Sequence, residues 1–359
     1  MRVFISDCEG PISKNDNAFE LTARCVPRGD RLFTVISRYD DVLADVLKRE
    51  NYKAGDTLKL ILPFLKAYRV TNETMRDFSA KSLILIPHVK EALRHIQGVA
   101  QAFIVSTSYE HYIRALCEAI NFPYLNTYST RVDLDRYELE EREEERLKKL
   151  AQEIAGMPII DIPPRAKSLE DFPEEYRWAI KRLDDIFWKE IAGMKIGKLL
   201  NEVNPVGGYE KAEAVRDAAR RANVDLEDVM YVGDSITDVE AFRLVRSHGG
   251  LTVSFNGNRY AIREAEVAVL SESSLVTSVI TELFAFHGKE GTLVILERWS
   301  RESLRESGVS KELLEKVFRI FPARLPKVEL ITSENMETLT LESEEFRKKV
   351  RGEVIGGLG

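Results

Sequence analysis

Short apolar runs separated by amphipathic segments dominate the pattern of this chain. Five mainly apolar runs are typical of strands buried in a parallel sheet, at residues 3–6, 102–106, 229–232, 251–255 and 267–270. Segments with the period of a helix lie between them, at residues 89–96, 109–119, 209–222 and 238–245. Strands that alternate with helices predict an α/β fold with a doubly wound parallel sheet. Ligands of such sheets bind beyond the carboxyl ends of the strands.

Three segments do not follow this alternation. Residues 14–85 and 131–199 have mainly helical periodicity, and the second contains a charge-dense helix at 138–149 whose simplest role is a solvated surface. Residues 289–359 add a predicted strand at 292–296, followed by helices. We therefore predict a core made of residues 1–13, 86–130 and 200–288, helical insertions at 14–85 and 131–199, and a C-terminal extension at 289–359.

Composition and charge narrow the class of protein without changing the expected fold. The chain has 359 residues, 44% of them hydrophobic, and a net charge of −7 from 52 basic and 59 acidic side chains. This mild acidity argues against a nucleic-acid binder, which usually carries a basic surface. No apolar run is long enough for a membrane-spanning helix, and the first residues lack the features of a signal peptide. Cysteines 8, 25 and 117 form no zinc spacing, and such sparse cysteine content is typical of a cytoplasmic protein.

Two carboxylates follow the first predicted strand, in the segment Asp7-Cys8-Glu9-Gly10-Pro11. One carboxylate in such a turn could attack phosphorus and form an aspartyl phosphate, and the other could pass a proton to the leaving group. Acidic turns after strands are common, so this motif alone is weak. Cys8 suggests the chemistry of cysteine phosphatases, but those enzymes need an arginine six residues later, where this chain has Lys14.

Hydroxyl groups and a lysine follow two further elements. The second predicted strand ends in Ser106-Thr107-Ser108, where hydroxyls and free N–H groups could bind a phosphate, although such residues often only cap helices. A glycine pair at 207–208 opens a helix that places Lys211 in its first turn. A cation is unfavourable at that end of the helix dipole. Binding of an anion would explain a lysine at this position, but an exposed surface lysine is an equally common reason.

The fourth motif follows the strand at 229–232 and has the sequence Gly233-Asp234-Ser235-Ile236-Thr237-Asp238. Its two aspartates lie about one helical turn apart at the start of a helix. Carboxylate oxygens of this kind suit Mg²⁺, which takes one or two carboxylates and keeps bound water. The simpler alternative is a capped helix with an acidic first turn. This motif is the most specific of the four.

Taken together and in this order, the four motifs resemble those of the haloacid dehalogenase superfamily of phosphohydrolases. The family pattern Asp-x-Asp-Gly stands here as Asp7-x-Glu9-Gly10, and the later motifs stand as Ser106, Lys211 and Asp234 with Asp238. Residues 86–93 resemble the phosphoserine-phosphatase branch. The resemblance implies a Rossmann-like core with helical caps at the insertions. The overall layout also resembles an archaeal group described as subunit R of energy-converting hydrogenase A or as a hypothetical phosphatase.

The resemblance also implies a role for each motif residue in phosphoryl transfer. Asp7 would be the nucleophile and Glu9 the general acid and base. Mg²⁺ would bind to Asp7, to the backbone carbonyl of Glu9 and to Asp234. The phosphoryl oxygens would contact Ser106, Thr107, the turn at Gly10, and Lys211, while Asp238 would hold Lys211 or a metal-bound water.

Glu9 departs from the family pattern, which has aspartate at this position. The extra methylene moves the carboxyl by about an ångström, and a misplacement of that size can lower a rate about 10²-fold. Two hypotheses therefore stay open. The first is a Mg²⁺-dependent phosphatase of a small phosphorylated metabolite. The second is a non-catalytic or regulatory subunit associated with a hydrogenase or another complex.

The helical insertions are expected to cover the site, and the pattern does not say which of them is the working lid. A covered site excludes bulk water and favours small substrates. Four arginines of the first insertion are candidates for contact with the leaving group, although surface or ion-pair roles are more common for each: 24, 28, 31 and 38.

Overall fold

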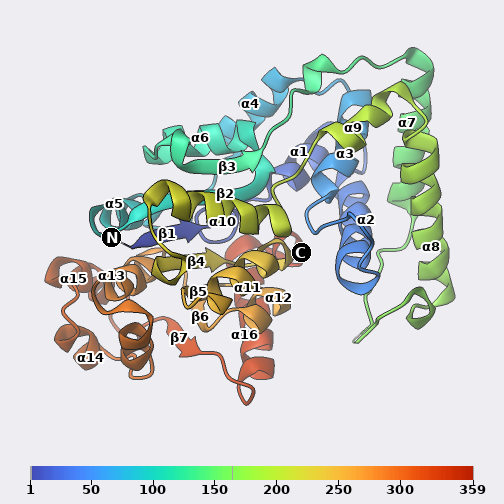
Figure 1. The fold of residues 1–359 in the computed structure, drawn as a ribbon. Coiled ribbons are helices and arrows are strands. Elements are labelled where there is room, and N and C mark those ends of the chain that lie inside the picture. Colours follow the sequence, from blue (N-terminus) through green and yellow to red (C-terminus); the bar gives the residue numbers. More distant parts are fainter. Residues whose placement is uncertain (1, 164, 359) are drawn as a thin grey trace.

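The computed structural model describes residues 2–163 and 165–358, and a seven-stranded sheet lies at its centre (Figure 1). The strand order is β3-β2-β1-β4-β5-β6-β7, with β7 antiparallel to β6 and all other neighbours parallel. This arrangement confirms the predicted α/β doubly wound fold. The strands are β1 (Val3–Ser6), β2 (Gln101–Tyr109), β3 (Thr127–Thr130), β4 (Val229–Gly233), β5 (Leu251–Phe255), β6 (Val267–Leu270) and β7 (Lys327–Leu330).

Helices cover both faces of the sheet, because alternate residues of the buried strands point to opposite sides. In β1, Phe4 faces a hydrophobic cluster with one set of helices, while Val3 and Ile5 face a second cluster with another set. The first face is covered by α5 (Val89–Val99), α6 (Glu110–Ile120), α13 (Leu275–Leu296) and α15 (Lys311–Ile320). The second is covered by α10 (Tyr209–Ala222) and α11 (Val239–Ser247), with α12 (Arg259–Glu264) beside them.

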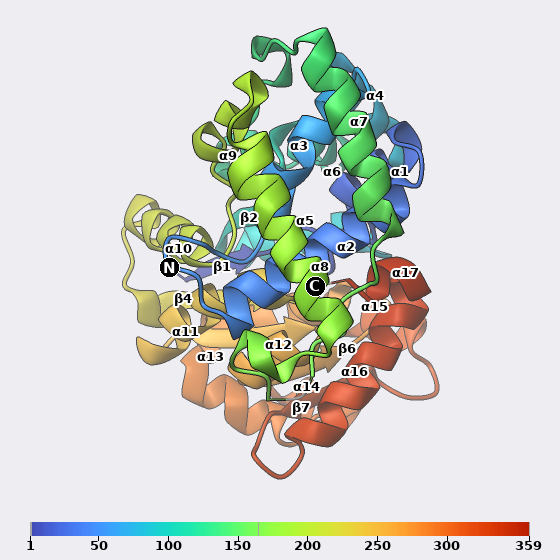
Figure 2. The same cartoon turned by 90° about the vertical axis from the view of Figure 1, so that its right-hand side faces the viewer.

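The two helical insertions pack on each other and form one body beside the carboxyl ends of the strands (Figures 1 and 2). Helix α7 contacts both α2 and α3, and fully buried side chains from both insertions, such as Ile36, Leu147 and Leu183, share one hydrophobic cluster. We call the helices that share this cluster the helical body. It comprises α1 (Asn17–Cys25), α2 (Gly29–Asp41), α3 (Thr57–Ala67), α7 (Glu141–Gly156), α8 (Glu174–Asp185) and α9 (Leu199–Glu202), while α4 (Asn72–Ser82) packs against α6.

The C-terminal extension differs from the sequence-based expectation. The strand predicted at 292–296 is wrong, because these residues form the last turns of α13, beyond a kink at Gly288. Thr292 and Leu296 are buried whereas Val294 is 57% exposed, which is the spacing of a helix face. The extension contributes the edge strand β7 instead, between two pairs of helices: α14 (Arg301–Glu306) with α15, and α16 (Met336–Arg351) with α17 (Glu353–Gly356).

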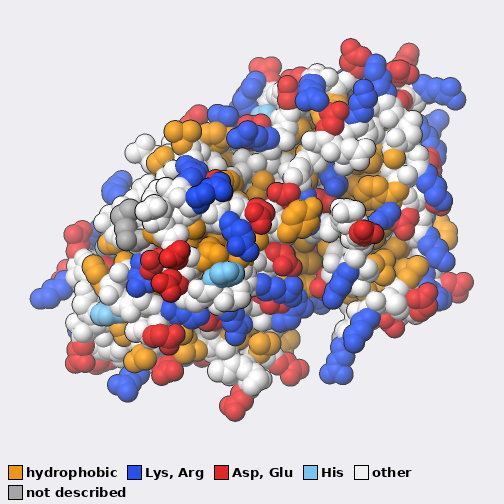
Figure 3. All heavy atoms as spheres, viewed as in Figure 1, with side chains coloured by type: hydrophobic (Ala, Val, Ile, Leu, Met, Phe, Trp, Pro, Cys, Tyr) orange, Lys and Arg blue, Asp and Glu red, His pale blue; other side chains and the backbone are white. Residues whose placement is uncertain are grey.

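Acidic and basic side chains are interspersed on the face shown in Figure 3, with no single basic patch across it. Many of these charges pair locally, as Arg182 does with Glu153 at 2.5 Å and with Glu190 at 2.7 Å. Within residues 2–163 and 165–358, none of the helices combines the length and the apolar character that crossing a bilayer requires.

Candidate active site

The residues of the four motifs come together at the carboxyl ends of β1, β2 and β4. Parallel pairing of β1 with both neighbours brings these ends to one edge of the sheet. Asp7 continues β1, since its N–H donates to the carbonyl of Val232 at 2.8 Å. Ser106 lies within β2, and Asp234 follows β4 directly. Lys211 reaches the same edge from the first turn of α10.

Lys211 is enclosed between two carboxylates. Its Nζ lies 2.7 Å from Asp7 Oδ2 and 2.7 Å from Asp238 Oδ1, and its side chain is 0% exposed. Burial disfavours the charged ammonium, but the carboxylates of Asp238 and Asp7 outweigh it and raise the pKa of Lys211. The structure therefore excludes a surface lysine and gives the cation at this helix start two buried partners.

Asp238 is fully engaged with its neighbours. Its Oδ1 accepts from Lys211 Nζ and, at 2.6 Å, from the Tyr231 hydroxyl. Its Oδ2 accepts the N–H groups of Asp234 and Ser235, both at 3.0 Å. Although burial opposes ionisation, Lys211 and these donors lower the pKa of Asp238. This carboxylate holds the lysine and the turn after β4 in place. Sequence reasoning missed Tyr231, whose only signal is a tyrosine in an aliphatic strand.

Asp7 is a buried carboxylate with one strong partner on each oxygen. Besides Lys211 at Oδ2, the N–H of Cys8 donates to Oδ1 at 2.6 Å. Burial raises the pKa of Asp7 to about 7, against the lowering effect of Lys211 and with further raising by Asp238 and Asp234. The site thus gathers more negative charge than Lys211 alone neutralises.

Gly10 permits a close approach between the first and fourth motifs. Its φ is +117°, and a Cβ at this position would lie 2.1 Å from Asp234 Oδ2. The N–H of Gly10 donates to the carbonyl of Ser13 at 2.8 Å, so it is used within the turn. A glycine is therefore needed at position 10 because the Asp234 carboxylate lies so close to its Cα. Its predicted contact with phosphate stays a prediction.

Glu9 points toward the helical body. Its Oε1 accepts the N–H of Asn17, the first residue of α1, at 2.6 Å. Burial, together with the neighbouring carboxylate of Asp16, raises the pKa of Glu9 well above its usual range, although the Asn17 N–H opposes this. The surroundings of Glu9 therefore shift its carboxyl toward the protonated form.

The three hydroxyl residues in the last part of β2 have different surroundings. Ser106 Oγ donates to Ser108 Oγ at 3.1 Å and accepts the Ser108 N–H at 3.2 Å, within the site. Thr107 Oγ1 instead donates to the carbonyl of Val206 at 2.9 Å and so supports the loop before α10. Ser106 and Ser108 are thus the hydroxyls best placed to meet a ligand.

Cys8 does not have the surroundings of a nucleophile. Its side chain is fully buried, and burial followed by the charges of Glu9 and Asp7 raises the pKa of the thiol well above its usual range. Nucleophilic cysteines need the opposite shift. The cysteine-phosphatase alternative therefore lacks support at this position.

A cavity of about 100 Å³ lies over these motifs and has walls from three parts of the chain. Asp7, Glu9, Ser106 and Asp234 line its base. The rest of the lining comes from the core, with Thr107, Ser108, Ser235, Ile236 and Thr237, from the first insertion, with Asp16, Phe33, Ser37, Asp40, Asp41, Gly55, Thr57 and Leu58, and from the C-terminal extension, with Arg347, Arg351 and Leu358.

Three of the four arginines predicted as possible ligand contacts form hydrogen bonds or ion pairs within the helical body, and Arg24 is exposed. Arg28 donates to the carbonyl of Ala155 at 2.7 Å, and Arg31 to that of Met157 at 2.8 Å. Arg38 pairs with Asp41 at 3.3 Å. Of the four, none lines the cavity. The charge that reaches the site comes instead from Arg347 and Arg351 of α16, which sequence reasoning missed.

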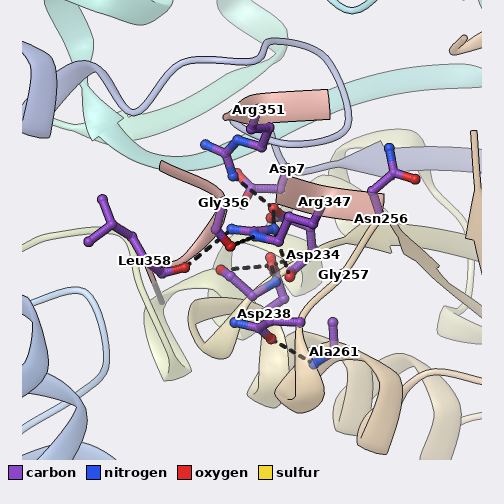
Figure 4. A network of polar contacts seen from close by, with 12 residues as sticks. Asp7, Asp234, Asp238, Asn256, Gly257, Ala261, Arg347, Arg351, Gly356 and Leu358 are labelled. Atoms are coloured by element: carbon purple, nitrogen blue, oxygen red, sulfur yellow. Dashed lines mark hydrogen bonds and ion pairs between the residues drawn. The ribbon is translucent and has the colours of Figure 1, made fainter. Parts of the chain in front are cut away.

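Both of these arginines contact Asp234, as Figure 4 shows. Arg347 Nη1 forms a buried ion pair with Asp234 Oδ2, and Arg351 Nη1 lies 3.2 Å from the same oxygen. The only sequence signal is two arginines four residues apart, which place both on one side of a helix. Many exposed helices carry the same pattern.

The aspartates of the site fit a divalent cation in part. Asp7, Asp234 and Asp238 offer oxygens that all lie within 4.8 Å of one another. Asp238 is fully engaged, which leaves Asp7 and Asp234. Among the described residues, nothing donates to the buried Asp234 Oδ1. An oxygen of this kind calls for a ligand, and Mg²⁺ prefers such hard donors. The arginines on Oδ2 are the feature that does not fit.

Comparisons with known proteins identify the family of the chain and a protein of similar fold. The family model of haloacid dehalogenase-like hydrolases matches residues 88–283. The structure of gene product AF1437 from Archaeoglobus fulgidus is 28% identical, has a TM-score of 0.81, and aligns over 100% of this chain and 99% of its own.

Two phosphoserine phosphatase structures align at lower similarity. The apo form is 12% identical with a TM-score of 0.46, over 76% of this chain and 94% of its own. The phospho-aspartyl intermediate analogue is 15% identical with a TM-score of 0.43, over 74% and 92%. No protein of curated function matches the sequence. The match of the family model across more than half of the chain identifies it as a member of the haloacid dehalogenase-like hydrolase family.

Proposed function

We propose that this hydrolase is a Mg²⁺-dependent phosphatase that acts on a small phosphorylated metabolite through an aspartyl-phosphate intermediate. The observation that carries the proposal is the buried chain Asp7–Lys211–Asp238, next to an Asp234 oxygen that has no donor among the described residues. A protein that only binds a ligand has no need for a buried carboxylate, such as that of Asp7, paired with a buried lysine at the end of a central strand.

Asp7 would attack the phosphorus atom of a phosphomonoester in line with the leaving oxygen. A bond then forms between an Asp7 oxygen and phosphorus, while the ester P–O bond breaks. Lys211 favours the ionised form of Asp7 that this step needs. Asp238 and Tyr231 hold the lysine in place.

Glu9 would donate its proton to the leaving oxygen, consistent with a pKa that burial raises well above its usual range. The resulting carboxylate would then take a proton from water, whose oxygen attacks the phosphorus and releases phosphate and Asp7. Ser106 and Ser108 would donate to the phosphoryl oxygens. Asp7, the backbone carbonyl of Glu9 and Asp234 would hold Mg²⁺, which when bound neutralises negative charge on the phosphoryl group.

The test is phosphate release from a panel of small phosphomonoesters, with and without Mg²⁺. The matched control is Asp7→Asn, which keeps the size of the side chain and removes the nucleophile. We expect turnover that needs Mg²⁺, is abolished by chelation and is absent from Asp7→Asn. Acid-quenched enzyme should carry a phosphoryl group on Asp7, detectable by mass spectrometry. No turnover above the Asp7→Asn background on any substrate would contradict the proposal and favour the non-catalytic alternative.

A further inference from the structure

The end of α16 and the residues after it cross the mouth of the active site. We call residues 347–358 the strap. Arg347 and Arg351 are almost fully buried, with side chains 3% and 4% exposed, and both reach Asp234. Arg347 Nη1 also donates to the backbone carbonyl of Asp234 at 3.2 Å. Figure 4 shows the two side chains converging on Asp234 from α16.

The strap is fixed to the core and to the helical body at the same time. Arg351 donates to the carbonyl of Lys14 at 3.1 Å and to that of Asn15, on the segment between β1 and α1. From the helical body, Arg38 donates to the carbonyl of Gly357 at 2.7 Å. Leu358 is 6% exposed and packs into the hydrophobic cluster of the helical body. Figure 2 shows α17 at this junction.

Arg347 also holds the strap together internally. Its Nε donates to the carbonyl of Gly356 at 3.2 Å and its Nη2 to that of Leu358 at 3.5 Å. The same guanidinium therefore joins the turn after α16 to Asp234. Moving the turn would pull the arginine from the carboxylate, and moving the arginine would release the turn.

The two guanidinium groups contact Oδ2 of Asp234, one of the two carboxylates left to hold a divalent cation. A buried carboxylate beside Asp7 needs a positive partner, and arginine stays charged in any protein environment. A cation that approaches Asp234 while both arginines remain would meet two like charges at close range. The cavity of about 100 Å³, with Leu358 in its wall, also leaves little room for a substrate.

We propose that the strap and Mg²⁺ compete for Asp234, so that the strap is an autoinhibitory contact that must leave before the metal and the substrate can bind. The inference rests on the metal site of the proposed function but not on turnover. Competition of this kind is reciprocal: the strap weakens Mg²⁺ binding by the same factor by which Mg²⁺ weakens docking of the strap.

The first test is Mg²⁺ binding to the full chain, measured by isothermal titration calorimetry with MgCl₂. Arg347→Met keeps the apolar stem and removes the charge from Asp234. We expect it to tighten Mg²⁺ binding by about 5- to 150-fold, the usual range of coupling between sites. Lys348→Met is the matched control, because this exposed neighbour on α16 loses the same charge without contacting Asp234. It should bind Mg²⁺ as the wild type does.

A second variant guards against misfolding of Arg347→Met. Leu358→Gln leaves Asp234 and both arginines unchanged, removes the apolar anchor of the strap and adds no carboxylate that could itself bind Mg²⁺. It should also tighten Mg²⁺ binding. Hydrogen exchange then reports the reciprocal effect: adding Mg²⁺ to the wild type should raise exchange in residues 352–358, and it should not do so in Asp234→Asn.

The outcomes separate this inference from the proposed function. Wild-type Mg²⁺ affinity in both strap variants, or a strap that stays protected at saturating Mg²⁺, would mean that metal and strap bind together and would overturn the inference, even if turnover is found. Mg²⁺ binding that exposes the strap without turnover on any substrate would support the inference and reject the proposed phosphatase. Absence of Mg²⁺ binding in every variant would overturn both.

Discussion

A glutamate at position 9 changes what the turn after β1 contacts. The longer side chain reaches the N–H of Asn17 at 2.6 Å and thereby links the turn to the first helix of the helical body. Burial raises the pKa of this carboxyl well above its usual range, whereas the Asn17 N–H at the start of α1 favours the ionised form and opposes the shift. The carboxyl of Glu9 thus has a fixed partner at the entrance to the helical body.

Replacing Glu9 by glutamine separates its hydrogen bond with the Asn17 N–H from its capacity to transfer a proton. The amide side chain can still accept the Asn17 N–H through its carbonyl oxygen, so Glu9→Gln should fold with an unchanged melting temperature. The amide cannot donate or take up a proton in the reaction, so kcat should fall by about 10²–10⁴-fold. Thermal unfolding and steady-state kinetics on the same preparation measure both effects.

Glu20→Gln is the matched control for this variant. Glu20 lies on α1 and accepts from Asn15 Nδ2 at 2.7 Å, outside the cavity. The same chemical change there should leave kcat close to that of the wild type. A Glu9→Gln enzyme with full kcat would show that another group moves the proton.

At the scale of elements, burial decided which strands could be predicted. The five predicted strands lie next to one another in the sheet, where nearly every side chain is apolar on both faces. The two strands that sequence reasoning missed, β3 and β7, are the edges of the sheet, and their half-exposed residues Thr127–Thr130 and Lys327–Leu330 lack that signal. The run at 292–296 shows the opposite error, since a short apolar segment does not distinguish a strand from a helix.

The junction of α2 with the loop before α3 makes stability depend on pH. Asp40 accepts from the Tyr52 hydroxyl at 2.6 Å and from the N–H of Gly55 at 2.9 Å, and burial, with the nearby charge of Asp56, raises its pKa from 3.8 to about 7. The folded protein thus holds a proton on Asp40 that the unfolded chain releases near pH 4. The free energy of unfolding should therefore fall as pH rises from about 4 to about 7.

Asp40→Asn removes this contribution, since an amide can accept the Gly55 N–H and donate to the Tyr52 hydroxyl at every pH. Urea unfolding below and above the window should show a smaller decline in the variant than in the wild type. Other buried acids, such as Asp41, contribute to both curves, so the difference between the two isolates Asp40. Parallel curves would mean that Asp40 is ionised throughout this range in the folded protein.

At the scale of the whole molecule, the site combines local motifs with distant segments. The sequence predicted the residues near the strand ends, Asp7, Ser106, Lys211 and Asp234, because each follows from an element and its turn. Arg347 lies 113 residues beyond Asp234, and nothing in its neighbourhood along the chain indicates that contact. Long-range packing also joined the two insertions into one helical body, which the pattern had left as separate candidates for a lid.

If the helical body has one shared core, damage in the second insertion must loosen the first. Leu147 of α7 is fully buried against α2 and α3. Leu147→Ala should cost about 2–5 kcal/mol of local stability through the lost transfer energy and the cavity left behind. Hydrogen exchange should rise in α2 and α3, which belong to the first insertion and lie at least 80 residues earlier in the chain. It should not rise in β4 and β5. Leu116→Ala, an equally buried site in α6, should instead raise exchange in β2 and β3, the strands that α6 contacts, and not in α2 and α3. Exchange that rises only in α7 and α8 after Leu147→Ala would mean that the two insertions open independently, and a lid would then have two separate parts.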